Sequence, residues 1–364
     1  MKYRVLRDGA VIGSALFSMF FGAGNMIFPP YLGMQSGFEW FIGFLCYFLA
    51  DIGLAIAVIS AMVKHGDFEN VLSSVTGKYI SKIVMVAVIL CLGPFICIPR
   101  TAATTFELAV LPLVPVVAPW VCYIVFFVLV YVLCIKETGI VDVVGKLMTP
   151  LLFAGLVYII LVGVMNPIGD ISDTIKTHNV AYAGIDAGYQ SLDALAAAVF
   201  GTLIITSARH KGYPSGKTQN FVVAISCVVA GFGLFVIYMG LTYLGATVSE
   251  IFDNHTLRSE LLIGIVERLV PGRVGVMLFS VISGLACLST AVAVTGSCAG
   301  YLSKATGDRI SYISFLTVIC IFSTVVSFAG VDRLVSFASP VLNILYPPVM
   351  IIVLISFFIK KNRM

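Results

Sequence analysis

The chain has 364 residues, of which 60% are hydrophobic and only 11% are charged, and its mean hydropathy is +1.06. Soluble domains contain about 25% charged residues, so this composition excludes a soluble protein and predicts a polytopic protein of the lipid bilayer. The net charge of +4 is modest, and nothing in the sequence suggests a nucleic-acid partner.

The first apolar segment, near residues 8–34, contains the stretch FFGAGNMIFPPYLG at positions 20–33. It continues past Gly13 without a small-residue cleavage site, so we expect a retained first helix and not a signal peptide. The glycines and paired prolines of this stretch predict a broken helix. N–H groups freed by a break can bind a carboxylate, and freed carbonyl groups can coordinate Na⁺. The alternative is that these residues only kink and pack a continuous helix.

Nine further apolar segments follow, each close to the roughly 20 residues that one bilayer crossing requires. They lie near residues 38–63, 79–108, 118–135, 140–165, 182–208, 217–246, 272–303, 311–330 and 335–359. The connection 247–271 is long enough to hold short helices of its own. The sequence therefore predicts an all-α membrane protein with about ten transmembrane helices.

Lysine and arginine are distributed unequally between the two sides of this predicted bundle. Sixteen of the 22 fall on the side of the amino terminus, five fall on the opposite side, and Arg100 lies within the third helix. Because positive residues concentrate in cytoplasmic loops, we expect both termini in the cytoplasm and a multi-pass protein of the cell (inner) membrane.

Ten helices divide into two sets of five, and an odd number places the second set in the opposite orientation. We therefore expect one transmembrane domain over residues 1–364, with inverted repeats near 8–165 and 182–359. Each repeat should open on an interrupted helix. In the second repeat this helix is SLDALAAAVFGTL (191–203), where Asp193 and Gly201 interrupt an apolar run. Helices 1 and 6 are thus the predicted discontinuous pair.

Two ionisable residues lie inside predicted helices, Asp51 on the second and Arg100 on the third. Intramembrane charges are functional candidates, and for Arg100 a gating role and a structural ion pair are equally open. The nine cysteines lack the spacing of a zinc site, and the four histidines fall in predicted loops, where they form no intramembrane proton relay. We expect no cofactor.

Several motifs, in order along the chain, resemble one family. They are SALFSMFFGAGNMIFPPYLG (14–33), GPFICIPRTAATTFELAV (93–110), GYQSLDALAAAVFG (188–201), LACLSTAVAVTGSCAGYL (285–302) and SPVLNILYPPVMI (339–351). Together they resemble the branched-chain amino acid:cation symporter family, and the resemblance runs the whole chain. It implies the leucine-transporter (LeuT) fold of two inverted five-helix repeats. It also implies two helices beyond the tenth, with any oligomer contacts that they make, and the oligomeric state stays unknown.

The resemblance implies a substrate site between the first and sixth helices. The N–H groups around Gly22, Ala23 and Gly24 would hold the amino acid carboxylate. Asp193 would contact the substrate's ammonium or an ion, or else would only mark a helix end. Small and apolar residues of the sixth helix would surround the aliphatic side chain: Ala196, Ala197, Val199, Phe200 and Gly201. The third helix lacks the central tyrosine of many amino acid transporters of this fold, and Thr101, Thr104 or Thr105 would substitute for it.

The resemblance also implies two Na⁺ sites. The carbonyl group of Phe20 and the side chain of Asn25 would line the first. Carbonyl groups of the first and eighth helices and an adjacent hydroxyl pair would form the second, which places it at Ser18, Phe21, Ala286, Ser289 and Thr290. The alternative for Ser289 and Thr290 is that their hydroxyls bond carbonyl groups one turn back on their own helix.

The expected function is Na⁺-coupled import of leucine, isoleucine or valine by alternating access, without an enzymatic step. An H⁺-coupled transporter is one alternative, supported by Asp51 and Asp193. A receptor-like or channel-like protein that binds an amino acid without concentrating it is another. Hydroxyl and carbonyl oxygens suit Na⁺, whereas proton coupling needs a titratable group.

Overall fold

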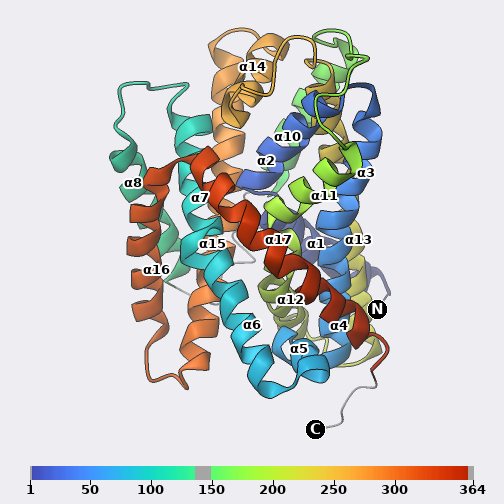
Figure 1. Ribbon diagram of the computed structural model, residues 1–364. Coiled ribbons are helices and arrows are strands. Elements are labelled where there is room, and N and C mark those ends of the chain that lie inside the picture. Colours follow the sequence, from blue (N-terminus) through green and yellow to red (C-terminus); the bar gives the residue numbers. More distant parts are fainter. Residues whose placement is uncertain (1, 136–148, 360–364) are drawn as a thin grey trace.

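The computed structural model describes residues 2–135 and 149–359, and within these ranges all regular structure is helical. The helices form one bundle, with α14 (Arg258–Leu269) at one end and α5 (Phe68–Thr76) at the other (Figure 1). We call these ends the α14 side and the α5 side. Of the lysines and arginines assigned to the side of the amino terminus, Lys136, Lys146, Lys360, Lys361 and Arg363 lie outside the described residues.

The described part of the chain holds seven helical stretches that are long and apolar enough to cross a membrane, together with two shorter apolar helices. The seven are Ala23–His65, Lys78–Val110, Val180–His210, Lys217–Ala246, Arg273–Ala305, Tyr312–Ala329 and Val331–Ser356, and the shorter two are Pro119–Cys134 and Thr149–Met165. Each of the ten predicted segments coincides with helix over most of its described residues; 140–148 of the fifth lie outside them. The chain is a multi-span membrane protein.

The first half of the chain contains more helices than predicted segments, because most of its segments are interrupted. Its elements are α1 (Lys2–Phe20), α2 (Ala23–Ser36), α3 (Trp40–Phe48), a π-helical turn (Leu49–Gly53), α4 (Leu54–His65), α5, α6 (Lys78–Leu90), a π-helical turn (Cys91–Phe95), α7 (Cys97–Thr105), a π-helical turn (Phe106–Val110), α8 (Pro119–Cys134) and α10 (Thr149–Met165). Gly37 has a φ of +51°, and this turn separates α2 from α3, which pack against each other. The stretch Ala23–His65 therefore holds the second part of the first crossing, α2, and the whole of the second crossing.

The second half contains one segment that is divided into two helices, α11 and α12, and four segments that are each formed by one main helix. Its elements are α11 (Val180–Ser191), α12 (Asp193–His210), α13 (Lys217–Ala246), α14, α15 (Arg273–Ala305), α16 (Tyr312–Val326), a 3₁₀ turn (Ser327–Ala329) and α17 (Val331–Ser356). The helix α14 occupies the connection 247–271, as the length of that connection predicted. The helices α8 and α16 stand together at the edge of the bundle, and α17 crosses in front of α11 and α12 (Figure 1).

The helices α2 and α13 approach each other closely near their carboxyl ends. A Cβ atom added at Gly33 would lie 1.9 Å from the Thr242 carbonyl oxygen, and one added at Gly245 would lie 1.9 Å from the Pro30 carbonyl oxygen. Backbone thus packs on backbone at both positions. Small residues permit this in membranes, where dispersion contacts supply much of the attraction between helices. The contact fixes α2, and with it the first helix break, against the rest of the bundle.

Two local predictions differ from the structure. Pro29 and Pro30 lie inside α2 and do not break it, so the interruption of the first segment is confined to Phe21 and Gly22. The helix α5 was not predicted, because the short segment Phe68–Thr76 is amphipathic and lies between apolar spans. Asp67 caps it by accepting a hydrogen bond of 2.7 Å from the Asn70 N–H.

Candidate functional site

The first helix break lies at Gly22, which is extended, with φ of −126° and ψ of −158°, and directly precedes α2. A Cβ atom added there would lie 2.6 Å from Oγ1 of Thr290 on α15. Only glycine, which has no Cβ atom, therefore fits at this position beside α15. The end of α1 presents backbone carbonyl groups at this point, and the start of α2 presents N–H groups and the positive end of its dipole.

The hydroxyl pair of α15 lies against the end of α1. The Thr290 hydroxyl donates to the Met19 carbonyl oxygen at 2.8 Å. The Ser289 hydroxyl lies 2.8 Å from the Ser18 carbonyl oxygen and 2.9 Å from that of Ala286 on its own helix. Thr290 thus does not satisfy a carbonyl one turn back, and Ser289 does so only in part. Carbonyl and hydroxyl oxygens of two helices converge here, as a site for a hard monovalent cation requires.

The second helix break lies at Leu192, which adopts the left-handed conformation with a φ of +75°. The helix α11 ends at Ser191 and α12 begins at Asp193, so Asp193 is the first residue of the second half-helix. Gly201 does not interrupt α12. A Cβ atom there would lie 2.6 Å from the Met62 sulfur, which shows that this glycine accommodates packing against α4. The predicted interruption at Gly201 was wrong.

Asn25 and Asp193 join the two breaks. The Asn25 amide donates to Oδ2 of Asp193 at 2.7 Å and to the hydroxyl oxygen of Tyr238 on α13, and it lies 3.5 Å from Oδ2 of Asp51. The Ser191 hydroxyl donates to Oδ1 of Asp51 at 2.5 Å. All five residues are buried, and Asp51 stands in the π-helical turn of the second segment. Two carboxyl groups therefore share one buried set of polar partners.

Arg100, on α7, contacts both breaks. Its guanidinium donates to the carbonyl oxygens of Gln190 at 2.6 Å and Ser191 at 3.2 Å, which are the last carbonyl groups of α11. A Cβ atom at Gly24 would lie 2.9 Å from the guanidinium, so the group also lies against the first turn of α2. It does not pair with Asp51, because no ion pair among the described residues includes Arg100.

The two breaks and α7 enclose a small central cavity of about 10 Å³. Most of the predicted substrate residues line it together with others that were not predicted. Its lining is Phe20, Gly22, Ala23, Gly24, Asn25, Cys97, Arg100, Thr101, Ser191, Leu192, Asp193, Ala196, Phe200 and Thr290. Because an amino acid is far larger than this volume, binding requires the lining helices to separate.

Other predicted residues lie outside the lining of this cavity. Ala197 and Gly201 are buried elsewhere on α12, and Val199 lines a different cavity. Phe21 packs its ring on Phe17 and Tyr238, with centroid distances of 6.0 and 6.2 Å. Ser18, Ala286 and Ser289 lie at the contact between α1 and α15.

The predicted threonines of α7 differ in their contacts. Thr101 lines the cavity, but its hydroxyl donates to the Ile98 carbonyl oxygen of its own helix at 2.6 Å. The Thr105 hydroxyl likewise donates to the Thr101 carbonyl oxygen at 2.8 Å. Thr104 is buried, and its hydroxyl has no partner among the described residues. Arg100 is therefore the residue of α7 whose donors bind the second break and whose guanidinium also lies against the first turn of α2.

Larger cavities lie on both sides of the central one. On the α5 side, a cavity of about 640 Å³ is lined by residues of α1, α6, α12 and α15, including Val199, Ser297 and Tyr301. Phe20 and Phe200 line the central cavity and contact each other edge to face, with ring centroids 5.4 Å apart. This aromatic pair is thus part of the wall of the central cavity.

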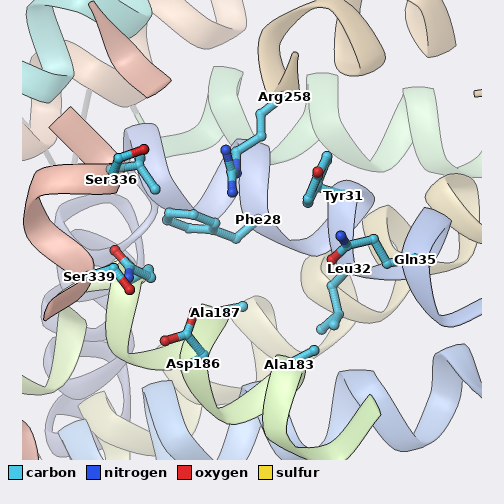
Figure 2. Close-up of a pocket in the computed structure, with 12 residues that line it drawn as sticks. Phe28, Tyr31, Leu32, Gln35, Ala183, Asp186, Ala187, Arg258, Ser336 and Ser339 are labelled. Carbon is cyan, nitrogen blue, oxygen red and sulfur yellow. The ribbon is translucent and has the colours of Figure 1, made fainter. Parts of the chain in front are cut away.

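On the α14 side, a cavity of about 310 Å³ lies between α2, α11, α14 and α17. Figure 2 shows Arg258 above the ring of Phe28, with Tyr31 beside it and Asp186 on the opposite wall. The Arg258 guanidinium lies 4.6 Å from the Tyr31 ring centroid and 6.0 Å from that of Phe28, and it pairs with Asp332 of α17 at 2.6 Å. Phe28 also stacks beneath the Arg100 guanidinium at 5.6 Å, which places its ring between this cavity and the central one.

Sequence reasoning missed Ser191 and Tyr238 as members of the central polar cluster. Tyr238 has no local signal, because its role depends on how α13 packs against α2. Ser191 had a signal in its position, since it directly precedes the second break.

Comparison with solved structures identifies the fold. The chain aligns with MhsT in complex with L-phenylalanine at a TM-score of 0.66 and 16% identity, covering 94% of this chain and 87% of MhsT. It aligns with the closed conformation of Mhp1, a nucleobase-cation-symport-1 family transporter, at a TM-score of 0.68 and 16% identity, covering 95% and 77%. These similarities show the leucine-transporter fold, with discontinuous helices 1 and 6.

Comparison of sequences identifies the family. The profile of the branched-chain amino acid transport protein family matches residues 6–364. Branched-chain amino acid permease BraB of Bacillus subtilis is 30% identical over 371 residues, covering 99% of this chain and 82% of the permease. Branched-chain amino acid permease BrnQ of Escherichia coli is 31% identical over 355 residues, covering 96% and 80%. The chain therefore belongs to the branched-chain amino acid transport protein family, whose members are membrane transporters and not enzymes.

Proposed function

We propose that this protein is a Na⁺-coupled symporter that imports leucine, isoleucine or valine across the cell membrane by alternating access. The observation that carries the proposal is the meeting of two helix breaks at one buried cavity, beside the hydroxyl pair of α15. The names of the relatives supply the class of substrate, and the geometry supplies groups for each part of an amino acid and for Na⁺.

The central cavity has groups that suit an α-amino acid. The N–H end of α2, at Gly22, Ala23 and Gly24, favours a carboxylate. The carbonyl end of α11 and the carboxyl group of Asp193 favour an ammonium group. Ala196 and Phe200 offer apolar surface to a branched side chain. Opposite ends of two half-helices thus receive opposite charges of one zwitterion.

Na⁺ would bind at two positions next to this substrate. In the first, the Asn25 side chain and the Phe20 carbonyl group lie beside the substrate carboxylate, and Asp193 and Tyr238 supply further oxygen atoms close to Asn25. In the second, the hydroxyls of Ser289 and Thr290 join carbonyl groups of α1. An ion at either position stabilises the backbone around the first break, so Na⁺ and substrate raise each other's affinity reciprocally.

The placement of the cavities supports the proposal of alternating access. With both termini in the cytoplasm, the cavity on the α14 side faces outward and the cavity on the α5 side faces inward. Movement of one inverted repeat against the other would open these cavities to the central site in turn. The membrane potential favours Na⁺ entry by about 2.3 kcal/mol per charge per 100 mV.

H⁺ coupling is the second candidate, and one observation favours it. Asp51 and Asp193 lie buried around the same Asn25 amide. One proton shared by these carboxyl groups would neutralise part of the cluster, as a coupling Na⁺ would. The two ions therefore have to be distinguished by experiment.

The test is uptake of radiolabelled leucine into proteoliposomes under an inward Na⁺ gradient, an equal K⁺ gradient and a pH gradient. Accumulation that requires Na⁺ supports the proposal. Accumulation driven by the pH gradient alone would replace Na⁺ by H⁺ and make Asp51 and Asp193 its binding residues. Leucine binding without accumulation under any gradient would support the receptor-like alternative.

A further inference from the structure

Arg100 is among the largest fully buried side chains of the bundle, with 2% of its surface exposed. Its guanidinium donates to two backbone carbonyl groups, and its Nε atom has no hydrogen-bond partner among the described residues. No ion pair in the described part of the chain includes it. Burying an unpaired charge is costly, because the lost hydration has to be replaced by an opposite charge or by dipoles. The α11 carbonyl dipoles supply only part of this.

A second observation concerns the position of the charge. The guanidinium lies against Gly24 in the first turn of α2, where the helix dipole is positive. Two positive groups therefore face the same cavity, the amino end of α2 and the Arg100 guanidinium of α7. Both positive groups attract an anion, and Asp193, whose carboxyl group lines the same cavity, forms no ion pair with Arg100 among the described residues.

We propose that Arg100 binds the substrate carboxylate and thereby selects amino acids over the corresponding amides and amines. This inference rests on the proposed function, because it assigns a residue of the same site. The planar guanidinium matches the two oxygens of a carboxylate, and the N–H groups of α2 approach the same position from the other side.

The contacts of Arg100 also indicate which groups change hydrogen-bond partners when substrate binds. The carbonyl groups of Gln190 and Ser191, at the negative end of α11, now accept from the guanidinium. A substrate ammonium is the natural replacement for it there, and the substrate carboxylate then takes the guanidinium donors. Substrate binding thus exchanges contacts within the site, and the Gln190 and Ser191 carbonyl oxygens and the guanidinium donors that they bind now all keep a partner.

The test compares ligands that differ only in the carboxylate. Binding of L-leucine and of L-leucinamide is measured in saturating Na⁺ on purified wild-type protein, Arg100→Gln and Arg100→Lys. We expect Arg100→Gln to weaken leucine binding at least about tenfold, the effect of losing a charged hydrogen bond. Leucinamide binding should change less than threefold, so the ratio of leucine affinity to leucinamide affinity should fall. Arg100→Lys should lie between, because it keeps the charge and loses the planar geometry.

Arg268→Gln is the matched control. Arg268 lies on α14, donates to the Gly264 carbonyl oxygen and stacks over Phe252, away from the central cavity. Folding is checked by size-exclusion profile and by thermal unfolding. If Arg100→Gln does not fold, the comparison is made on Arg100→Lys, in which a selective loss of leucine binding over leucinamide binding supports the assignment.

The two proposals fail in different ways. If the wild-type protein accumulates leucine with Na⁺ while the Arg100 variants keep wild-type leucine affinity, or lose leucine and leucinamide equally, the assignment of Arg100 falls and the symporter stands. If the wild-type protein binds no branched-chain amino acid, the proposed function falls, and the assignment of Arg100 falls with it.

Discussion

Thr290 of α15 donates a hydrogen bond of 2.8 Å to the carbonyl oxygen of Met19, in the last turn of α1. The two residues are far apart in sequence and meet where the first helix breaks. A cation at this point would draw the hydroxyl oxygen and the α1 carbonyl oxygens into one coordination shell. The contact between α1 and α15 would then depend on Na⁺, and closing or opening it would be linked to ion binding.

Replacing Thr290 or Ser289 by alanine should therefore raise the Na⁺ concentration that gives half-maximal leucine uptake. Loss of one oxygen ligand of a charged group costs about 1.5–3 kcal/mol, so we expect an increase of about tenfold or more. Na⁺ titration of uptake measures it. Ser283→Ala is the matched control, because the Ser283 hydroxyl donates only to its own helix, at Phe279 and Ser280. Unchanged Na⁺ dependence in both variants would remove this cation site.

Asp193→Asn should weaken leucine binding and raise the Na⁺ requirement together. Its carboxylate accepts from Asn25 at 2.7 Å inside the central cavity, so the neutral amide removes the charge that balances a cation or an ammonium group. Asn25→Ala should do the same, since it removes the side chain that joins the two breaks. The expected losses are about tenfold in each affinity, measured by leucine binding at several Na⁺ concentrations.

Asp186→Asn is the control for this comparison. Asp186 lies on α11, outside the central cavity, and accepts from Asn343 at 3.1 Å. Leucine affinity should stay within about twofold of the wild type. Equal losses in Asp186→Asn and Asp193→Asn would show that charge removal disturbs the bundle in general, and would contradict a specific role for Asp193.

The long apolar segments and the two interrupted helices were predictable, because bilayer thickness and backbone hydrogen bonding constrain them strongly. Which residues interrupt each helix could not be predicted. Pro29 and Pro30 remain inside α2, where their lost hydrogen bonds free the carbonyl groups of Asn25 and Met26. Gly201 serves packing against Met62 and not a break. In both cases the outcome depends on a neighbouring helix that local sequence does not specify.

Only part of the polar cluster could be predicted from the sequence, for the same reason. Asp51 and Asp193 stood out as charges in apolar segments, yet their meeting at Asn25 and Tyr238 depends on how four helices cross.

The helix α5 had a local capping signal, although its hydropathy is too low for a membrane span. Asp67 is a good N-cap, and Gly77, with a φ of +80°, ends the helix.

Ala196→Val should shift selectivity towards smaller amino acids. Ala196 lines the central cavity, and two added methyl groups would occupy space that a branched side chain needs. One methylene of mismatch is worth about 1–3 kcal/mol, so leucine affinity should fall at least about fivefold relative to alanine. Competition binding with leucine, valine and alanine measures the ratio. Ala198→Val is the control, because Ala198 lines the α5-side cavity; an equal shift in that variant would argue against the substrate position.

Breaking the Arg258–Asp332 pair should open the cavity on the α14 side. The pair joins α14 to α17 at 2.6 Å, and it holds Arg258, which lines the cavity, over Phe28 and Tyr31. Both side chains are partly exposed, so the pair is worth only about 1 kcal/mol, which corresponds to about a fivefold change in the open population. Asp332→Asn should therefore raise the labelling rate of a Ser339→Cys variant by a membrane-impermeant thiol reagent, since Ser339 lines this cavity.

Three comparisons decide whether this ion pair acts as a gate. Arg258→Gln should raise labelling as much as Asp332→Asn, and the double variant no further, because both remove the same contact. Arg268→Gln, on the same helix but away from the cavity, should leave labelling unchanged. High salt should narrow the difference between wild type and variants, because it screens a partly exposed pair. Labelling that is insensitive to Asp332→Asn, to Arg258→Gln and to the double variant would show that α14 closes this side by its apolar contacts alone.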